Sequence, residues 1–205
     1  MSPEIGSLRR VVTVAGIAAA AAMLLSLIHG HTGPLIELAR QAEREQALEY
    51  VLPPFDNRPL DTARTVTVDD GSAAQLYTST KDGEVMGRAL ELSTAEGYGP
   101  RIDLLVAATA DGTVSGVYIL GHQETPGLGA KMTRGQTSWN DPTAVTGEPF
   151  ILQFAGASLD GFDFRVRSDG GQVDAITAST ITSRAVSRAV ERALRSMTEA
   201  AKEQG

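Results

Sequence analysis

The 205-residue sequence contains no cysteine and only three histidines, His29, His31 and His122. The absence of cysteine excludes disulfides, thiolate zinc sites, cysteine-ligated iron–sulfur clusters and attached c-type haem in this chain. Two of the three histidines lie at the edge of an apolar segment, so a histidine-based metal site is not expected either. If the chain carries out redox chemistry, its cofactor is therefore expected to be organic.

The sequence also lacks an excess of basic residues. It has 18 Lys and Arg against 25 Asp and Glu, which gives a formal net charge of −7, and it contains no basic stripe. A nucleic-acid-binding protein normally has the opposite balance, so this class of partner is excluded. Hydrophobic residues make up 42% and charged residues 21%, a composition typical of a folded protein rather than a disordered one.

The N-terminal part has no charged residue from position 11 to position 28. Eighteen residues of helix span roughly 27 Å, close to the hydrocarbon thickness of a bilayer. Arg9 and Arg10 precede this run and the nine residues after it contain no Lys or Arg, which predicts a cytoplasmic N-terminus and a periplasmic remainder. A cleaved signal peptide is the alternative, but no small-residue cleavage site follows Leu27. We expect residues 1–33 to hold a single-pass anchor in a bacterial inner membrane.

A second helix is predicted from residue 34 to residue 52. Apolar side chains recur at helical spacing from Leu35 to Leu48 and beyond, with charged residues between them, and Pro53 follows directly. This helix either leads from the membrane to the folded part or packs within that part. We assign residues 34–62 to a connecting segment.

Residues 63–205 are predicted to form an α+β domain built on an antiparallel sheet, with a C-terminal helix. Val186, Val190, Leu194 and Met197 repeat at helical spacing and indicate a helix from about residue 182 to residue 202. Short apolar stretches separated by turn residues predict the strands. These stretches are VTV at 66–68, AQLYTST at 74–80, VMGRALELST at 85–94, IDLLVAAT at 102–109, VSGVYILG at 114–121, FILQFAG at 150–156 and FDFRVRS at 162–168.

The first candidate ligand-binding segment is GHQETPGLGAKM, residues 121–132. Gly127 and Gly129 allow backbone conformations with positive φ or a close approach to a ligand, and Pro126 fixes the turn. The polar side chains around them are Glu124, Thr125 and Lys131. Such a loop suits a planar or phosphorylated ligand, although an ordinary strand-to-helix connection can have the same composition.

The second candidate segment is DAITASTITSRAV, residues 174–186, just before the last helix. A helix N-terminus has unpaired N–H groups and the positive end of the helix dipole, so it suits a phosphate. The alternative is helix capping, which needs one Ser or Thr rather than five. The five hydroxyl residues are Thr177, Ser179, Thr180, Thr182 and Ser183.

At these residues the sequence resembles the FMN-binding domain family, which is shared by the G subunit of the Rnf electron-transport complex and the C subunit of the sodium-translocating NADH:quinone oxidoreductase. The family pattern is Asp, two variable residues, Ser or Thr, usually Gly, usually Ala, then Thr, and residues 174–180 match it as DAITAST. The loop ETPGLG at 124–129 and the element Gly-Tyr-Gly at 97–99 are two further signatures in the expected order. The departures are Ala178 in place of Gly and Ser179 in place of Ala.

The resemblance implies an FMN that is joined covalently through its phosphate to Thr180. In the family a separate Mg²⁺-dependent flavin transferase makes this bond with FAD as the donor. Asp174 is the candidate for recognition by the transferase or for orienting the hydroxyl, with a turn cap as the alternative. Leu128 is expected to pack on the isoalloxazine, and Glu124, Thr125 or Lys131 to bind its polar edge. The full set of expected cofactor-binding residues is Glu124, Thr125, Gly127, Leu128, Gly129, Lys131, Asp174, Thr177, Ser179, Thr180, Thr182 and Ser183.

The implied function is that of a membrane-anchored flavoprotein electron carrier in an Rnf-type, ion-translocating ferredoxin:NAD oxidoreductase complex. Its implied partners are the other subunits of that complex, with the flavin transferase during maturation. No independent catalytic residues and no metal ligands are expected. Two alternatives remain open from the sequence: a flavin-free structural subunit of a membrane complex, and a periplasmic domain that binds a soluble phosphorylated ligand.

Overall fold

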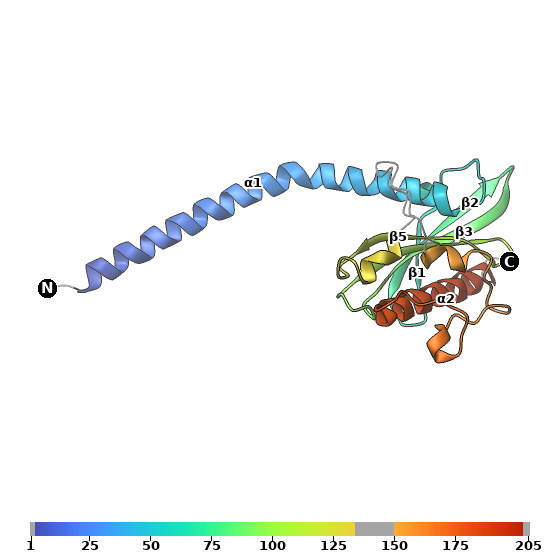
Figure 1. The fold of residues 1–205 in the computed structure, drawn as a ribbon. Helices are drawn as coiled ribbons and strands as arrows, with labels where there is room; N and C mark the ends of the chain where they lie inside the picture. The colour runs from blue at the N-terminus through green and yellow to red at the C-terminus, as the bar shows by residue number, and fades with distance from the viewer. Residues whose placement is uncertain (1–2, 134–149, 203–205) are drawn as a thin grey trace. The chain divides into compact units, whose positions relative to one another are not determined.

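The computed structural model describes residues 3–133 and 150–202. The chain consists of two compact units, the first ending at Glu43 and the second beginning at Arg44. The N-terminal unit is part of one helix, and the second unit contains a five-stranded sheet with helices (Figure 1).

Helix α1 runs from Pro3 to Val51 without interruption. Its apolar stretch is exposed along its length, with Leu25 and Leu27 68% and 67% accessible. From Arg9 onward this helix is long and apolar enough to cross a membrane, and it is the one such helix among the described residues. The predicted N-terminal apolar helix is confirmed, and its exposed side chains are consistent with a single-pass anchor.

The last turns of α1 belong to the folded unit. Leu48 and Val51 are buried in an apolar cluster with Tyr77 and Leu105 of the sheet. The backbone of α1 comes close enough for the Ser115 hydroxyl to donate to the carbonyl of Val51 at 2.6 Å. The part of α1 from Arg44 onward therefore packs within the second unit, which is one of the two roles that the sequence leaves open for residues 34–52.

The sheet is an antiparallel meander in which each strand pairs with its neighbour in sequence. The turn between the second and third strands has Asp82 at φ 52° and Gly83 at φ 83°, as a two-residue hairpin with the right strand twist requires. The five strands overlap the first five of the seven stretches predicted as strands. The strands are β1 (Arg64–Thr67), β2 (Ala73–Lys81), β3 (Glu84–Thr94), β4 (Ile102–Thr109) and β5 (Val114–His122).

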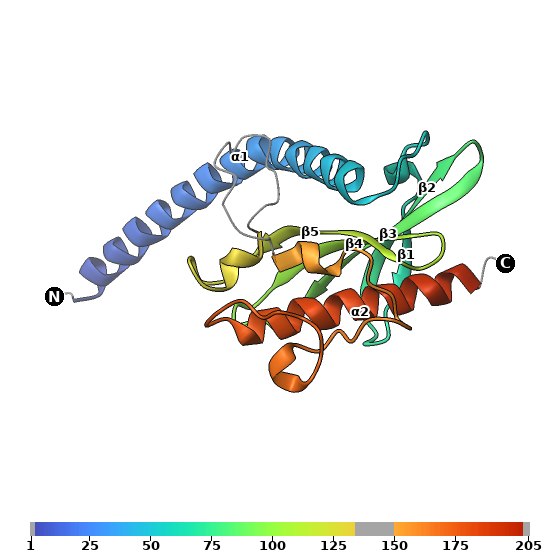
Figure 2. The same ribbon diagram turned by 45° about the vertical axis from the view of Figure 1, so that its right-hand side comes forward.

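Helix α2 (Thr180–Lys202) covers the sheet face opposite to the one that packs on the end of α1 (Figures 1 and 2). Its apolar stripe, which includes Val186, Val190 and Leu194, is buried in the larger of the two cores, together with Leu90 and Val106 of the sheet. The predicted C-terminal helix is confirmed. The sheet is thus covered on both faces by helices that lie at opposite ends of the sequence.

Two stretches predicted as strands do not join the sheet. Residues 150–156 instead begin with a 3₁₀ helix, η3 (Phe150–Phe154), because Phe150 and Phe154 are buried one helical turn apart. Residues 162–168 bury alternate side chains as a strand does, but Val166 forms only an isolated bridge, with Val173. The N–H of Arg167 donates to the carbonyl of Val173, whose own N–H donates to the carbonyl of Arg165. Three further 3₁₀ helices are η1 (Pro59–Thr62), η2 (Gly129–Thr133) and η4 (Arg167–Asp169).

Candidate functional site

Glu124 connects the three signature segments. Its side chain is 5% exposed and lies just after the end of β5. One carboxylate oxygen accepts a hydrogen bond from the backbone N–H of Gly99 at 2.9 Å, and the other accepts one from the hydroxyl of Thr182 at 2.8 Å. Segments that are far apart in the sequence therefore meet at one buried carboxylate, whose two oxygens are both satisfied.

Glycines make the room for this carboxylate. A Cβ atom on Gly97 would lie 2.4 Å from one oxygen of Glu124, and a Cβ on Gly129 would lie 2.3 Å from the other. Neither distance is possible for a real side chain, so any larger residue at either position displaces Glu124. Gly127, in contrast, has φ +76° and open space around it, which is the left-handed conformation expected for the turn.

The segment before α2 is folded back on the helix by Ser183. Its hydroxyl donates to the carbonyl of Ser179 at 2.9 Å and accepts from the N–H of Ile176, also at 2.9 Å. The N–H of Ser183 bonds to the same carbonyl of Ser179, which makes Ser179 the residue that precedes the first helical turn. The helix therefore begins at Thr180 rather than at about residue 182, where the sequence pattern places its start.

Ala178 adopts a left-handed backbone conformation, with φ 62°. A Cβ atom makes this region unfavourable by roughly 1–2 kcal/mol, which is why glycine is preferred there. The turn through Ala178 places the hydroxyl residues on either side of it in different environments. Thr177 is exposed, Ser179 is 8% exposed, and Thr180 is partly exposed.

Thr180 is the first residue of α2, a helix of 23 residues with no acidic side chain in its first turn. Its hydroxyl makes no hydrogen bond to any of the residues that the structure describes. One turn further on, Arg184 forms a bidentate ion pair with Asp169, with both N–O distances 2.7 Å. The hydrogen bonds from Arg184 hold the pKa of Asp169 below its usual range.

Asp174 lies at the surface and forms an ion pair with Arg167. Its backbone is held on both sides by the amide of Gln153, which accepts from the Asp174 N–H at 2.7 Å and donates to its carbonyl at 3.3 Å. The predicted roles of Asp174 involve its side chain alone. Gln153 and Arg167 are not predicted, since nothing in the sequence connects them to residue 174.

Three large apolar side chains are exposed next to the residues that Glu124 holds together. Tyr98 is 75% exposed and lies between Gly97 and Gly99. Leu128 is 40% exposed and precedes Gly129, and Ile181 is 51% exposed and precedes Thr182. Each is therefore the sequence neighbour of a residue that packs against Glu124.

Comparison with known proteins identifies the family. Residues 97–195 match the family described as the FMN-binding domain. The G subunit of the ion-translocating oxidoreductase complex of Vibrio cholerae is 36% identical over 179 residues, which cover 83% of this chain and 80% of the relative. The corresponding subunits of Cereibacter sphaeroides and Pseudomonas aeruginosa are 39% and 34% identical, over 84% of this chain and 76% and 79% of theirs.

This chain belongs to the family of these G subunits. The resemblance inferred from the three signature segments is thereby confirmed, and so is the fold expected from it. The matched FMN-binding region begins at Gly97 and ends at Arg195, so it contains all three segments that meet at Glu124. The region also includes the turn at Ala178 and the start of α2.

The remaining predicted residues of this family member lie around the same loop. Thr125 is exposed, and its carbonyl accepts hydrogen bonds from Leu128 and Ala130. Lys131 is partly buried within η2 and makes no ion pair with the described residues. Thr125 and Lys131 therefore remain available to a ligand, whereas Glu124 and Thr182 are occupied with each other.

Proposed function

We propose that this chain is a membrane-anchored electron carrier whose FMN is joined through its phosphate to the hydroxyl of Thr180. The proposal rests first on the state of that hydroxyl. Among the neighbouring Ser and Thr residues, Thr180 is at the helix terminus, is accessible, and has no hydrogen-bond partner within the described structure. The adjacent Ser179 is 8% exposed, which favours Thr180 as the acceptor that a modifying enzyme can reach.

The start of α2 suits a phosphate. Its free N–H groups and dipole favour a negative charge by about 0.3–1 kcal/mol, and no carboxylate in the first turn opposes this. Arg184, one turn further along the helix, is already paired with Asp169. The N–H groups at the start of α2 are therefore the donors that the chain offers a tethered phosphate.

The exposed side chains of Tyr98, Leu128 and Ile181 are suited to a flat aromatic ring next to the attachment point. Lys131 and Thr125 supply polar groups on the same loop. When bound, FMN supplies one- and two-electron redox chemistry, and the role of these residues is to hold and orient it. No acid–base pair is needed, because such a protein passes electrons on without transforming a metabolite.

The attachment is a group transfer from FAD by a separate Mg²⁺-dependent flavin transferase. A bond forms between the Thr180 oxygen and the FMN phosphorus, the pyrophosphate bond of FAD breaks, AMP leaves, and the hydroxyl proton is released. A covalent tether maintains a high local concentration of flavin even where free flavin is scarce.

The matched relatives are named as subunits of an ion-translocating oxidoreductase complex. We infer that this chain occupies the corresponding place in such a complex, with α1 as its membrane anchor. Arg9 and Arg10 before the apolar stretch favour a cytoplasmic N-terminus and a periplasmic FMN domain.

The test is co-expression of the full chain with a flavin transferase, followed by denaturation and measurement of flavin fluorescence on the protein band. We expect fluorescence in the parent and none in Thr180→Val. Ser179→Ala is the matched control, since it removes the adjacent hydroxyl and introduces the residue that is usual at this position of the family pattern, and it is expected to retain the fluorescence.

Absence of flavin fluorescence on the parent protein band, in the presence of active transferase, would contradict covalent attachment of FMN and favour a flavin-free structural subunit. Fluorescence that persists in Thr180→Val but is lost in Ser179→Ala would move the attachment by one residue. Flavin that copurifies with the native protein and is released on denaturation would indicate a soluble phosphorylated ligand instead.

A further inference from the structure

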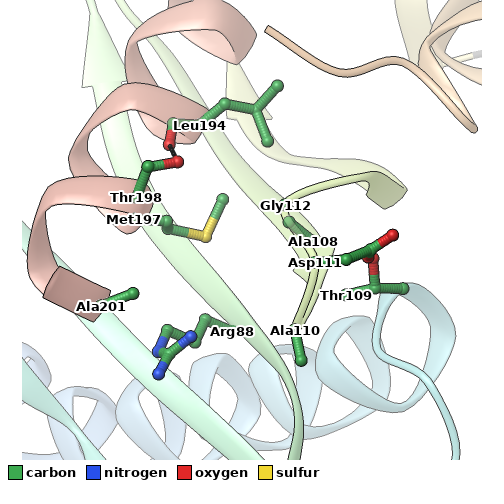
Figure 3. A pocket seen from close by; sticks show the side chains of 10 residues that line it. All are labelled: Arg88, Ala108, Thr109, Ala110, Asp111, Gly112, Leu194, Met197, Thr198 and Ala201. Carbon is green, nitrogen blue, oxygen red and sulfur yellow. Dashed lines mark hydrogen bonds between the residues drawn. The ribbon is translucent and has the colours of Figure 1, made fainter. Parts of the chain in front are cut away.

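A small cavity lies at the other end of α2 from Thr180, between that helix and the turn that joins β4 to β5 (Figure 3). Its volume is about 100 Å³. Met197 lies 17 residues after Thr180, which corresponds to about 26 Å along the helix, so the cavity is separate from the proposed FMN site. The walls are mostly apolar, with Ala108, Ala110, Leu194, Met197 and Ala201 among the lining residues.

The cavity contains one cationic group, the guanidinium of Arg88 on β3. Its Nε atom is buried and has no hydrogen-bond partner, and its side chain forms no ion pair with residues 3–133 or 150–202. Burial and the nearby charge of Arg64 both lower the pKa of Arg88. Arg88 as a whole is half-buried, but a buried N–H of a charged group is costly without an acceptor, so this side of the guanidinium favours an anion.

The other polar groups of the lining are already engaged. The hydroxyl of Thr198 donates to the carbonyl of Leu194 at 2.8 Å. Asp111 accepts hydrogen bonds from the hydroxyls of Thr109 and Thr113, and Figure 3 shows it directed away from Arg88. The cavity therefore offers one planar cation surrounded by apolar walls.

We propose that this cavity binds a monocarboxylate, with its two oxygens on the guanidinium of Arg88 and its short apolar body against Met197 and Ala108. The planar fork of a guanidinium matches a carboxylate in bidentate fashion. A phosphate dianion would need further donors that the lining does not offer. The volume limits the ligand to a few carbon atoms or to the end of an acidic side chain.

The carboxylate has two possible sources, a free short-chain acid and an acidic group of a neighbouring protein subunit. The primary test uses butyrate as the probe. The full chain in detergent is titrated with sodium butyrate at constant ionic strength, with sodium chloride as the balancing salt, and binding is followed by calorimetry and by the thermal unfolding midpoint. We expect saturable binding in the millimolar range and a rise of the midpoint, with no such effect from n-butylamine.

Arg88→Gln is expected to weaken butyrate binding at least tenfold. Ala201→Leu keeps the charge and fills the cavity, and is expected to abolish binding as well, which provides a second variant if the first folds poorly. Arg195→Gln is the matched control, since Arg195 is on the same helix but pairs with Glu191 outside the cavity, and it should bind like the parent. The proposal would be overturned if butyrate and chloride gave the same heats and the same unfolding midpoint in the parent. It would also be overturned if Arg88→Gln and Ala201→Leu bound butyrate as the parent does.

The source is distinguished by repeating the titration on the chain purified within its membrane complex. Retained butyrate binding would indicate a free acid as the ligand. Loss of binding there, with binding present in the isolated chain, would indicate that a carboxylate of a neighbouring subunit fills the cavity. Neither result depends on whether Thr180 carries FMN, so this inference and the proposed function are tested separately.

Discussion

Gly99 and Thr182 both donate a hydrogen bond to the carboxylate of Glu124, at 2.9 and 2.8 Å, from segments more than eighty residues apart. The buried carboxylate joins the element before β4, the loop after β5 and the start of α2. The position of Thr180, two residues before Thr182, therefore depends on these hydrogen bonds to Glu124. Gly97 and Gly129 leave the space that the Glu124 carboxylate occupies.

Gly129→Ala is expected to destabilise the domain by about 2–3 kcal/mol. The added methyl group would lie 2.3 Å from Glu124 Oε2 and 2.8 Å from the Thr182 hydroxyl, so the carboxylate must move and its hydrogen bond with Thr182 is lost. Urea unfolding of the full chain in detergent measures the change. Gly121→Ala is the control, because its methyl group would have its nearest neighbour at 3.6 Å, and a change within about 0.5 kcal/mol is expected. Similar losses in the two variants would contradict the packing argument.

Ala178→Gly is expected to stabilise the protein by about 0.5–1 kcal/mol. The left-handed φ of 62° costs an alanine roughly 1–2 kcal/mol, and glycine removes this cost. The greater flexibility of glycine in the unfolded chain offsets about 0.4–1 kcal/mol of the resulting stabilisation. Thermal unfolding provides the measurement. Ala175→Gly, in the same segment but without a positive φ, should show no stabilisation. A loss of stability in Ala178→Gly would show that the turn relaxes in the folded protein.

Most of the fold could be predicted because the signals are local. The apolar stretch, the five strand segments and the amphipathic pattern of α2 each depend on neighbouring residues. The two stretches wrongly predicted as strands show the limit of this reasoning. Residues 162–168 alternate buried and exposed side chains as a strand does. A strand also needs a neighbouring strand to hydrogen-bond with, and the backbone of this segment instead bonds to residue 173, just after the turn that follows it.

The sequence proposes members of a candidate site, but it does not predict the contacts between them. The hydroxyl-rich segment and the glycine loop are both expected from the sequence to meet a ligand, but the sequence could not show that Glu124 and Thr182 bind each other. The family pattern points to Thr180 rather than Ser179, and the structure adds that the two differ in burial. Gln153 of η3 holds the backbone of Asp174 from 21 residues earlier in the sequence, a contact that no local pattern indicates.

Acid is expected to weaken the loop that contains Asp163. The hydrogen bond from Arg165 lowers the pKa of Asp163 from 3.8 to about 2. A carboxylate with a lowered pKa in the folded state stabilises the fold above its unfolded pKa, and this contribution is lost as the pH falls through about 2. Carbon-13 detected NMR of the Asp163 carboxyl should show a midpoint near pH 2 in the parent and a higher one in Arg165→Gln. An unchanged midpoint in that variant would assign the shift to another cause.

Tyr77 connects the sheet to the end of α1. It is buried, its hydroxyl donates to Glu91 at 2.8 Å, and Glu91 pairs with Arg44 of α1 at 3.0 Å. Burial first, and then the hydrogen bond to Glu91, raise the pKa of Tyr77 well above its usual value of 10. Because the folded state holds this proton more tightly, the stabilisation is complete below pH 10 and is lost as the pH rises further.

At pH 11 the parent and Tyr77→Phe are therefore expected to show the same tyrosinate absorbance, since Tyr77 in the folded parent stays protonated. The thermal midpoint of the parent should fall more steeply above pH 10 than that of Tyr77→Phe, which has no proton to lose at this position. In Glu91→Gln the negative charge is gone but the burial remains, so the pKa of Tyr77 should fall part of the way back, and the absorbance should then exceed that of the matched Tyr77→Phe/Glu91→Gln double variant. A full tyrosinate signal from Tyr77 in the folded parent at pH 11 would mean that the hydroxyl is open to solvent and that the Arg44–Glu91–Tyr77 connection does not hold α1 on the sheet.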